Sequence, residues 1–224
     1  MHATEPGKFD SDWRERVRLR NGQHVTLRLL QPADRELYLN GFAKLSAEAR
    51  YHRFFEPKDH LTAAEVHYLV DLDQVHHFAI VATHGHDPAE GVGLARCVEI
   101  PGTPNVAEPA VTVLDHWQGL GIGRLLMRRL VEAARARGVE RFHVDILAGN
   151  SPMLSLLDEV GVELLPARDN GVLTVDLPLP DALTADPRDG HGHDHQRRSA
   201  LERLLRLAAK GIVRVLPRSA SGLR

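Results

Sequence analysis

Three closely spaced glycines are the residues best suited to chemistry in this chain. Gly119, Gly121 and Gly123 fall within five residues, and a residue without a Cβ lets the backbone pass close to a ligand. Residues 111–113 before them are Val-Thr-Val, which suits a buried strand, whereas apolar residues after them recur at helical spacing: Leu126, Leu130, Val131 and Ala134. The glycines therefore form a turn between a strand and a helix. Because the first amides of a helix lack internal partners, we expect this turn to bind an anion, most naturally a pyrophosphate.

The spacing of the glycines argues against two common phosphate-binding motifs. A dinucleotide fingerprint requires G-x-G-x-x-G, but Arg124 stands where the third glycine belongs. A P-loop requires G-x-x-x-x-G-K-[ST], and no Lys-Ser or Lys-Thr pair follows the glycines. A dehydrogenase and a P-loop nucleotide-binding protein are therefore disfavoured. A tight strand-to-helix connection that binds no ligand stays open as the structural alternative.

Residues 118–123 read Gln-Gly-Leu-Gly-Ile-Gly, which matches the pattern Q/R-x-x-G-x-G/A. This segment resembles the acyl-CoA loop of the GNAT superfamily of N-acyltransferases, and the amphipathic helix after it, with its Ala-Arg-Gly end, resembles that family as well. The resemblance implies acetyl-CoA as co-substrate and no required metal. It implies that the co-substrate contacts these residues: Val111, Thr112, Val113, Gln118, Gly119, Leu120, Gly121, Ile122, Gly123, Arg124 and Asn150.

The resemblance also implies catalytic roles for the strand 107–114. In this family that strand separates from the next parallel strand, here 142–147, and the pantetheine of the donor pairs with the backbone between them. A backbone N–H near Val113 is then the expected oxyanion donor. Glu108 is the expected general base, because residues 106–111 match the A-E-x-A-V entry to this strand. A surface glutamate at a strand end is the alternative for Glu108. Pro109 removes an amide, so we expect it to shift the start of the strand.

Two positions on the next helix bear on the same reaction. Many proteins of this family have a tyrosine there that acts as general acid to the leaving thiolate, and this chain has Leu157 instead. A CoA thiolate can leave without help, so activity is still expected. Asn150 is retained, although capping of the helix explains it equally well.

Residues 45–55, Leu-Ser-Ala-Glu-Ala-Arg-Tyr-His-Arg-Phe-Phe, carry a second resemblance. They look like the L-S-x-E-[SA]-R-Y-x-R-F-F segment of a GNAT branch that includes the acetyltransferase domains of bacterial protein lysine acetyltransferases. This resemblance implies an N-acetyltransferase with a protein lysine as acceptor. A small-molecule amine acetyltransferase and a non-catalytic acyl-CoA-binding regulatory module are the alternatives. Tyr51 and Arg53 either line the acceptor cleft or, for Arg53, cover an aromatic cluster.

The remaining pattern predicts an α/β (α+β) fold in which helices cover both faces of a mixed, mostly antiparallel sheet. Asn21-Gly22 between two alternating segments is a hairpin signal, and Thr62 with Glu65 forms a capping box. We expect strands at 17–20, 24–29, 77–82, 91–98, 107–114, 142–147 and 172–177, and helices at 33–45, 61–70, 125–137 and after 150. The loops 46–60 and 165–171 are expected to shape the acceptor pocket.

Composition divides the chain into four segments: a flexible arm at 1–16, the catalytic domain at 17–180, a His/Asp-rich linker at 181–198 and a basic amphipathic helix at 199–224. Eight Lys or Arg and one acid lie from Arg197 to Arg224, against twenty basic and twenty-nine acidic residues before them. The tail is therefore expected to dock on the body, on a twin subunit or on an anionic surface; without interleaved aromatic residues, no specific nucleic-acid binding is expected. The histidines at 191, 193 and 195 suit a solvated segment better than a metal site.

Cysteine content and hydropathy indicate the compartment. Cys97 is the single cysteine, so no internal disulfide forms, and its apolar neighbours favour a packed strand residue. His116, near the glycine turn, is expected to be exposed rather than catalytic. The sequence has no run of 18 apolar residues, and its first residues lack the pattern of a signal peptide. We therefore expect a cytoplasmic protein.

Overall fold

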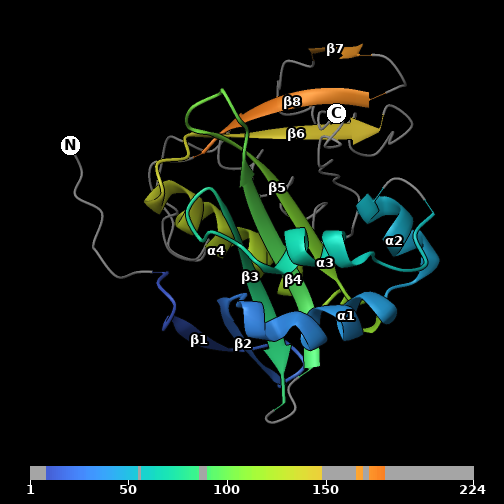
Figure 1. Ribbon diagram of the computed structural model, residues 1–224. Coiled ribbons are helices and arrows are strands. Elements are labelled where there is room, and N and C mark those ends of the chain that lie inside the picture. Colours follow the sequence, from blue (N-terminus) through green and yellow to red (C-terminus); the bar gives the residue numbers. More distant parts are fainter. Residues whose placement is uncertain (1–8, 55–56, 86–89, 148–164, 169–171, 180–224) are drawn as a thin grey trace.

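A single mixed sheet organises the chain (Figure 1). The computed structural model describes residues 9–54, 57–85, 90–147, 165–168 and 172–179. Its eight strands lie in the order β1-β2-β3-β4-β5-β6-β8-β7. They are β1 (Arg14–Arg18), β2 (His24–Leu29), β3 (His77–His84), β4 (Glu90–Glu99), β5 (Val106–Val113), β6 (Arg141–Leu147), β7 (Leu165–Arg168) and β8 (Val172–Pro178). Within the described ranges, every neighbouring pair is antiparallel except β5 and β6, which confirms the expected mixed sheet.

Helices cover both faces of this sheet. The helices are α1 (Arg35–Ala43), α2 (Ala47–Phe54), α3 (Ala63–Val70) and α4 (Ile122–Ala136), with short 3-10 turns at Pro32–Asp34 and Asp115–Trp117. Helix α4 packs on β3, β4 and β5, whereas α1 packs on β4 and α3 from the opposite side (Figure 1). The predicted two-faced arrangement is therefore confirmed.

Local sequence signals explain where several elements begin and turn. Gly22 in the turn between β1 and β2 has φ of 86°, a conformation that glycine adopts without a Cβ clash. The Thr62 side chain accepts a hydrogen bond from the Glu65 amide, and Glu65 in turn bonds the Thr62 amide, so the predicted capping box is confirmed. These signals fix the hairpin and the start of α3 independently of the core.

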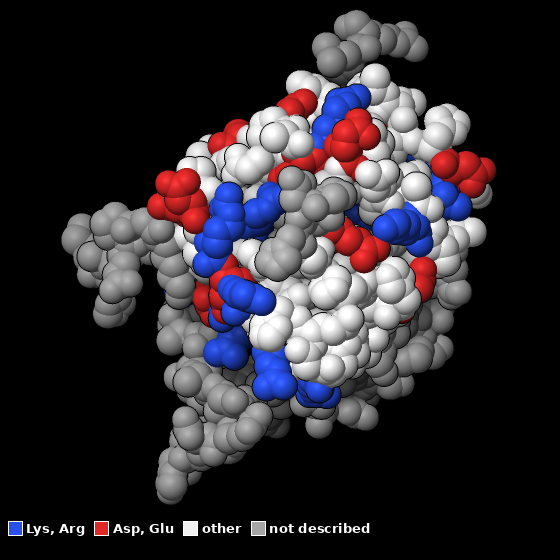
Figure 2. Space-filling model, turned by 90° about the horizontal axis from the view of Figure 1, so that it is seen from below, with Lys and Arg blue, Asp and Glu red and all other residues white. Residues whose placement is uncertain are grey.

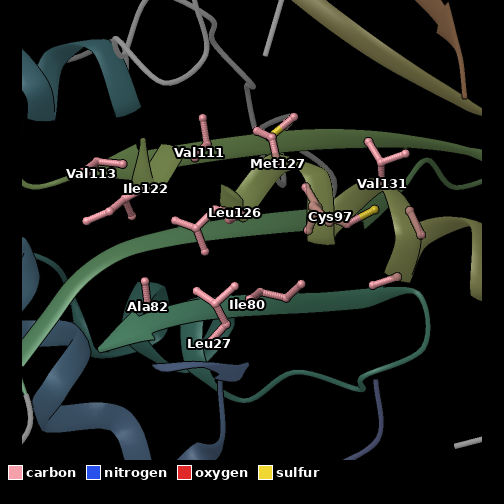
Figure 3. Packing of buried hydrophobic residues seen from close by; sticks show 14 of the residues in the cluster. Leu27, Ile80, Ala82, Cys97, Val111, Val113, Ile122, Leu126, Met127 and Val131 are labelled. Atoms are coloured by element: carbon pink, nitrogen blue, oxygen red, sulfur yellow. The ribbon is translucent and has the colours of Figure 1, made fainter. Parts of the chain in front are cut away.

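The main core lies between α4 and the sheet (Figure 3). Apolar side chains of α4 contact strand residues on the facing side, and the two sets are Ile122, Leu126, Met127 and Val131 from the helix, and Leu27, Ile80, Cys97, Val111 and Val113 from the strands. Cys97 is 1% exposed, and burial raises the pKa of its thiol well above the usual range. The prediction that Cys97 is a packed strand residue is confirmed.

Several boundaries differ from the expectation, and the segment 46–60, expected to be a loop, contains the helix α2 (Ala47–Phe54). Residues 9–16 are not a loose arm, because β1 begins at Arg14 and the Phe9 ring is buried against Trp13. Residues 165–168 form β7 rather than a loop, since they pair with β8. The helix expected at 33–45 is a 3-10 turn followed by α1, which ends at Ala43.

Charged side chains of both signs share the surface seen from below in Figure 1 (Figure 2). Several of the described charges form ion pairs, such as Lys44 with Glu90 and the bidentate pair of Arg28 with Asp34. Among the helices within the described ranges, none is long and apolar enough to cross a bilayer. The predicted linker at 181–198 and tail helix at 199–224 lie outside the described residues.

Candidate functional site

The backbone of β5 presents alternate residues to its two neighbours. Leu114 donates its amide to the Val92 carbonyl and Ile100 donates to the Val106 carbonyl, so the even-numbered residues of β5 bond to β4. In an antiparallel pair the intervening residues direct their N–H and C=O groups to the other side. The backbone groups of Val111 and Val113 therefore face β6.

This alternation also explains why proline is tolerated inside the strand. Pro109 is an odd-numbered residue, so the amide that it lacks would have pointed toward β6 rather than into the ladder with β4. The strand consequently starts at Val106, and the expected shift of its start by Pro109 is wrong.

The two parallel strands pair only at the beginning of β5, within the described residues. Val106 pairs with Arg141 and Ala107 with Phe142, whereas β5 continues to Val113 and β6 to Leu147. Beyond Ala107 the strands diverge, as the ribbons show (Figure 1). The backbone groups of Val111 and Val113 thus face the widening space between β5 and β6.

The glycine-rich turn adopts the conformation that its residues predicted. Gly119 has φ of 76° and Gly121 has φ of 90°, and an added Cβ at either position would meet no atom within 4 Å. These glycines are therefore required by backbone conformation, not by crowding. Gly121 is the N-cap of α4 and offers no side chain to cap it, and the first turn of α4 carries no acidic residue. The amides of Ile122, Gly123 and Arg124 at this helix start suit an anionic ligand.

Asp115 and Gln118 connect the turn to its surroundings. The Gln118 side-chain amide donates to the Val113 carbonyl at 3.2 Å and to Asp115 Oδ1 at 3.3 Å. Asp115 also accepts from the Ser46 amide at 3.1 Å and from Ser46 Oγ at 3.3 Å, and Ser46 Oγ accepts from the Ala49 amide in the first turn of α2. Hydrogen bonds thus join the end of β5, the turn and the start of α2.

A pocket lies on the face of the sheet that α1 and α2 cover. Its lining is Leu30, Leu37, Tyr38, Gly41, Phe42, Leu45, Arg53, Phe54, Val81, Gly91, Gly93, Leu94, Thr112 and Leu114. Because Thr112 belongs to the end of β5 and Leu114 directly follows that strand, the pocket adjoins the backbone that faces β6. Arg53 lines this pocket and Tyr51 does not, while the stacking of Arg53 on Phe54 agrees with the aromatic-covering alternative.

A buried arginine lies beside this pocket. Arg96 of β4 is 2% exposed and donates to His77 Nε2 and to the Leu69 carbonyl. Desolvation by burial, and then the nearby Arg96 charge, lower the pKa of His77 to about 4, so the imidazole is neutral at pH 7. Burial also lowers the pKa of Arg96 to about 10, and the electrostatic effect of the pocket residue Tyr38 opposes that shift.

Glu108 lies on the same face of β5 as Thr112, because side chains alternate along a strand. It is partly buried and pairs in register with Val98. Four residues at about 3.3 Å each place it roughly 13 Å along the strand from Thr112. The structure thus groups the end of β5 with the turn and sets Glu108 apart from the pocket lining. The predicted contact residue Asn150 and the position Leu157 lie outside the described residues.

Other predicted site residues have mixed surroundings. His116 is exposed, as expected, and its ring contacts Trp117. Leu120 and Arg124 are partly buried, whereas Ile122 and Gly123 are buried at the start of α4. In the described part of the chain, no group of three or more metal-ligating side chains occurs.

Sequence reasoning missed Asp115 and the two glycines of β4. Gly91 and Gly93 line the pocket, and the register of β3 with β4 shifts at this point, leaving Val92 as an extra residue. An added Cβ at Gly91 would lie 3.3 Å from Leu37 Cγ, and one at Gly93 would lie 3.0 Å from Leu126 Cδ1. Two glycines around one valine inside a strand were a readable signal of a β-bulge or a close approach.

Comparison with known proteins identifies a family whose sequence pattern this chain matches. The profile of the Acetyltransferase (GNAT) family matches residues 39–162, which include the glycine-rich turn, α4 and most of the pocket lining. Acetyltransferase Pat of Mycolicibacterium smegmatis is 36% identical over 174 residues, which are 76% of this chain and 51% of that protein. This chain thus spans about half the length of that relative.

Two further proteins extend the likeness. Acetyltransferase PA5475 of Pseudomonas aeruginosa is 33% identical over 147 residues, covering 64% of this chain and 77% of that protein. The crystal structure of the GNAT domain of S. lividans PAT superimposes with a TM-score of 0.65 at 27% identity, covering 77% of this chain and 100% of that one. Sequence and structure thus indicate the same family.

Proposed function

The chain belongs to the GNAT family of acetyltransferases, and from this premise we propose that it transfers an acetyl group from acetyl-CoA directly to a primary amine. One observation carries the proposal most strongly: backbone groups of Val111 and Val113 face a widening space between two parallel strands, next to an uncapped helix start. An extended thiol arm suits the strand backbone, and a pyrophosphate suits the helix start.

The donor is held mainly by backbone in this proposal. The amides from Gly119 to Arg124 bind the pyrophosphate, and the odd-numbered residues of β5 pair with the pantetheine. Gln118 holds the turn against the Val113 carbonyl and Asp115. Thr112 contacts the acyl end from the pocket side, and Asn150 is proposed as a further contact.

The chemical step needs a polarised carbonyl and an unprotonated amine. The Val113 amide donates to the thioester oxygen and stabilises the oxyanion, an effect worth roughly 2.7–4 kcal/mol in other acyl-transfer enzymes. Glu108 is the proposed base, and because it lies roughly 13 Å from Thr112 along the strand, a chain of several water molecules carries the proton of the amine to its carboxylate. The amine then bonds to the acyl carbon, the C–S bond breaks, and CoA leaves as a thiolate.

The acceptor is proposed to be a protein lysine, on the strength of the segment at 45–55 and its likeness to protein lysine acetyltransferases. A small-molecule amine is the second candidate, because a pocket lined by residues of α1, α2, β4 and β5 lies beside the proposed donor site. A regulatory module that binds acyl-CoA without turnover is the third reading.

Calorimetry of the full chain with acetyl-CoA, NAD and ATP tests the donor assignment, and release of free thiol with a panel of amines tests turnover. We expect micromolar binding of acetyl-CoA alone and thiol release that depends on an amine. No acetyl-CoA binding in a folded sample would overturn the proposal. Tight binding without thiol release for any amine or lysine peptide would favour the regulatory module.

A further inference from the structure

The pocket beside β5 is apolar apart from one cation. Arg53 is the one charged residue among the described residues that line it, and no carboxylate belongs to that lining. The other lining side chains are aliphatic, aromatic or hydroxylic. An ionised group in such surroundings exerts a stronger field than one in open water.

Arg53 differs from the arginines that serve structure in this protein. On the same helix, Arg50 pairs with Asp59 at 3.8 Å, and elsewhere Arg129 makes a bidentate pair with Glu15. Both arginines of α2 lie over a phenylalanine ring: the guanidinium carbon of Arg50 is 5.7 Å from the centre of the Phe42 ring, and that of Arg53 is 5.2 Å from the centre of the Phe54 ring. Within the described residues no ion pair joins Arg53 to a carboxylate, and a guanidinium has the fork of donors that matches a carboxylate ligand.

A second cation reinforces the field of the first. Arg96 lies close enough to the pocket residues Tyr38 and Arg53 for both to act on its pKa, and the Arg53 charge acts on His77 as well. His77 is neutral and adds no negative charge. The α2 end of the pocket is therefore positive, which favours an anion and disfavours an ammonium ion.

We propose that Arg53 binds a carboxylate of the acceptor, so that the pocket selects amines that carry an anionic group nearby. This inference rests on the proposed acetyl transfer. It assigns Arg53 two effects: a bidentate contact that positions the acceptor, and a positive potential that favours the neutral, nucleophilic form of the amine. The carboxylate belongs either to a free amino acid or to an acidic residue beside a lysine in a peptide.

Matched acceptors with and without the negative charge provide the test. Thiol release from acetyl-CoA is measured with a series of ω-amino acids and their amides, and with lysine peptides that carry Asp or Asn next to the lysine. We expect kcat/KM to be roughly tenfold or more higher for the acid member of at least one series. The series that shows the preference identifies the source of the carboxylate.

Variants of Arg53 and Arg50 on α2 test whether Arg53 causes the preference for acid over amide acceptors. Arg53→Gln is expected to bring acid and amide within about twofold of each other, whereas Arg53→Lys keeps part of the preference. Arg50→Gln is the matched control, since Arg50 does not line the pocket and is expected to leave the preference unchanged. Acetyl-CoA binding and thermal unfolding verify that each variant is folded.

Two results would overturn the inference: equal kcat/KM for acid and amide in every series, or a preference that persists in Arg53→Gln. A different result would overturn the proposed function, namely acetyl-CoA binding with no transfer to any amine. In that case calorimetry of the CoA complex with each acid and its amide still decides the role of Arg53. Equal affinities for both members would then contradict it.

Discussion

The proposed donor side and the proposed acceptor side of this site differ in construction, since one consists of backbone and the other of side chains. The donor side consists of backbone: odd-numbered residues of β5 that face β6, and the amides of the turn that starts α4. The acceptor side consists of side chains from α1, α2, β4 and β5, with Arg53 as its charge. A backbone surface fixes one ligand for a whole family, whereas a side-chain surface is free to change with the acceptor.

Distorting the backbone of the glycine-rich turn is expected to have the largest effect on acetyl-CoA binding. In Gly121→Glu a residue with a Cβ must adopt φ of 90°, which costs about 1–2 kcal/mol, and its carboxylate lies at an anion site. Together with the lost amide geometry, we expect acetyl-CoA affinity to fall by about a thousandfold or more, measured by calorimetry.

Gly102→Glu is the matched control for that substitution. Gly102 also has a positive φ, of 77°, and an added Cβ would meet no atom within 4 Å, but it lies in the turn between β4 and β5. It carries the same strain and the same new charge away from the proposed donor site. Equal loss of acetyl-CoA binding in both variants would show that strain, not the anion site, is responsible.

Replacing the proposed base, Glu108, is expected to slow the chemical step without weakening the binding of acetyl-CoA. Glu108→Gln keeps the shape of the side chain and removes its ability to accept a proton, so we expect kcat to fall by roughly a hundredfold. The dissociation constant of acetyl-CoA should stay within about twofold. Steady-state kinetics with saturating donor and calorimetry give both numbers, and Glu99→Gln on the neighbouring strand is the control. An unchanged kcat would leave Glu108 as a surface residue of β5.

His77, which is bonded to Arg96 beside the pocket, is expected to make the free energy of unfolding depend on pH. Burial and the Arg96 charge lower the pKa of His77 from 6.5 to about 4 in the folded protein. Between these values the unfolded chain binds a proton that the folded protein does not, so stability falls as pH decreases from about 6.5 to 4. The expected loss is on the order of 2–3 kcal/mol, measured by urea unfolding, and His77→Gln should remove it.

His76, the neighbour of His77 in sequence, is a suitable control because its pKa is raised rather than lowered. The Glu99 carboxylate raises the pKa of the exposed His76 imidazole, so its contribution is present at low pH and declines as pH rises through the folded pKa. His76→Gln should therefore leave the acid-side loss in place. If His77→Gln also leaves it in place, the buried neutral imidazole is not its source.

The same contrast explains how much the sequence could predict. Gly119 and Gly121 were identified because their backbone conformation excludes other residues, and the period change around them located β5 and α4. The pocket could not be derived, because Tyr38, Arg53 and Gly91 come together only through the packing of α1 and α2 on β4. Residue 165 begins β7 although nothing local distinguishes it from a loop, since pairing with β8 forms that strand.

Asp115 joins the two sides, and its removal is expected to have the smallest effect. Asp115→Ala deletes the contacts to Ser46 and Gln118, which lie at 3.1–3.3 Å and are exposed to water. Loss of such hydrogen bonds costs about 1 kcal/mol, so we expect the affinity for acetyl-CoA to fall about fivefold. If Asp115 also transmits donor binding to α2, the KM of the acceptor should rise in the same variant. Ser46→Ala deletes the contact of Ser46 Oγ with Asp115 and the hydrogen bond that Ser46 Oγ accepts from the Ala49 amide, but it keeps the bond from the Ser46 amide to Asp115, so it should lower donor affinity less than Asp115→Ala does. A change in acceptor KM with unaltered donor affinity would instead show that the two regions act independently and that Asp115 serves α2 alone.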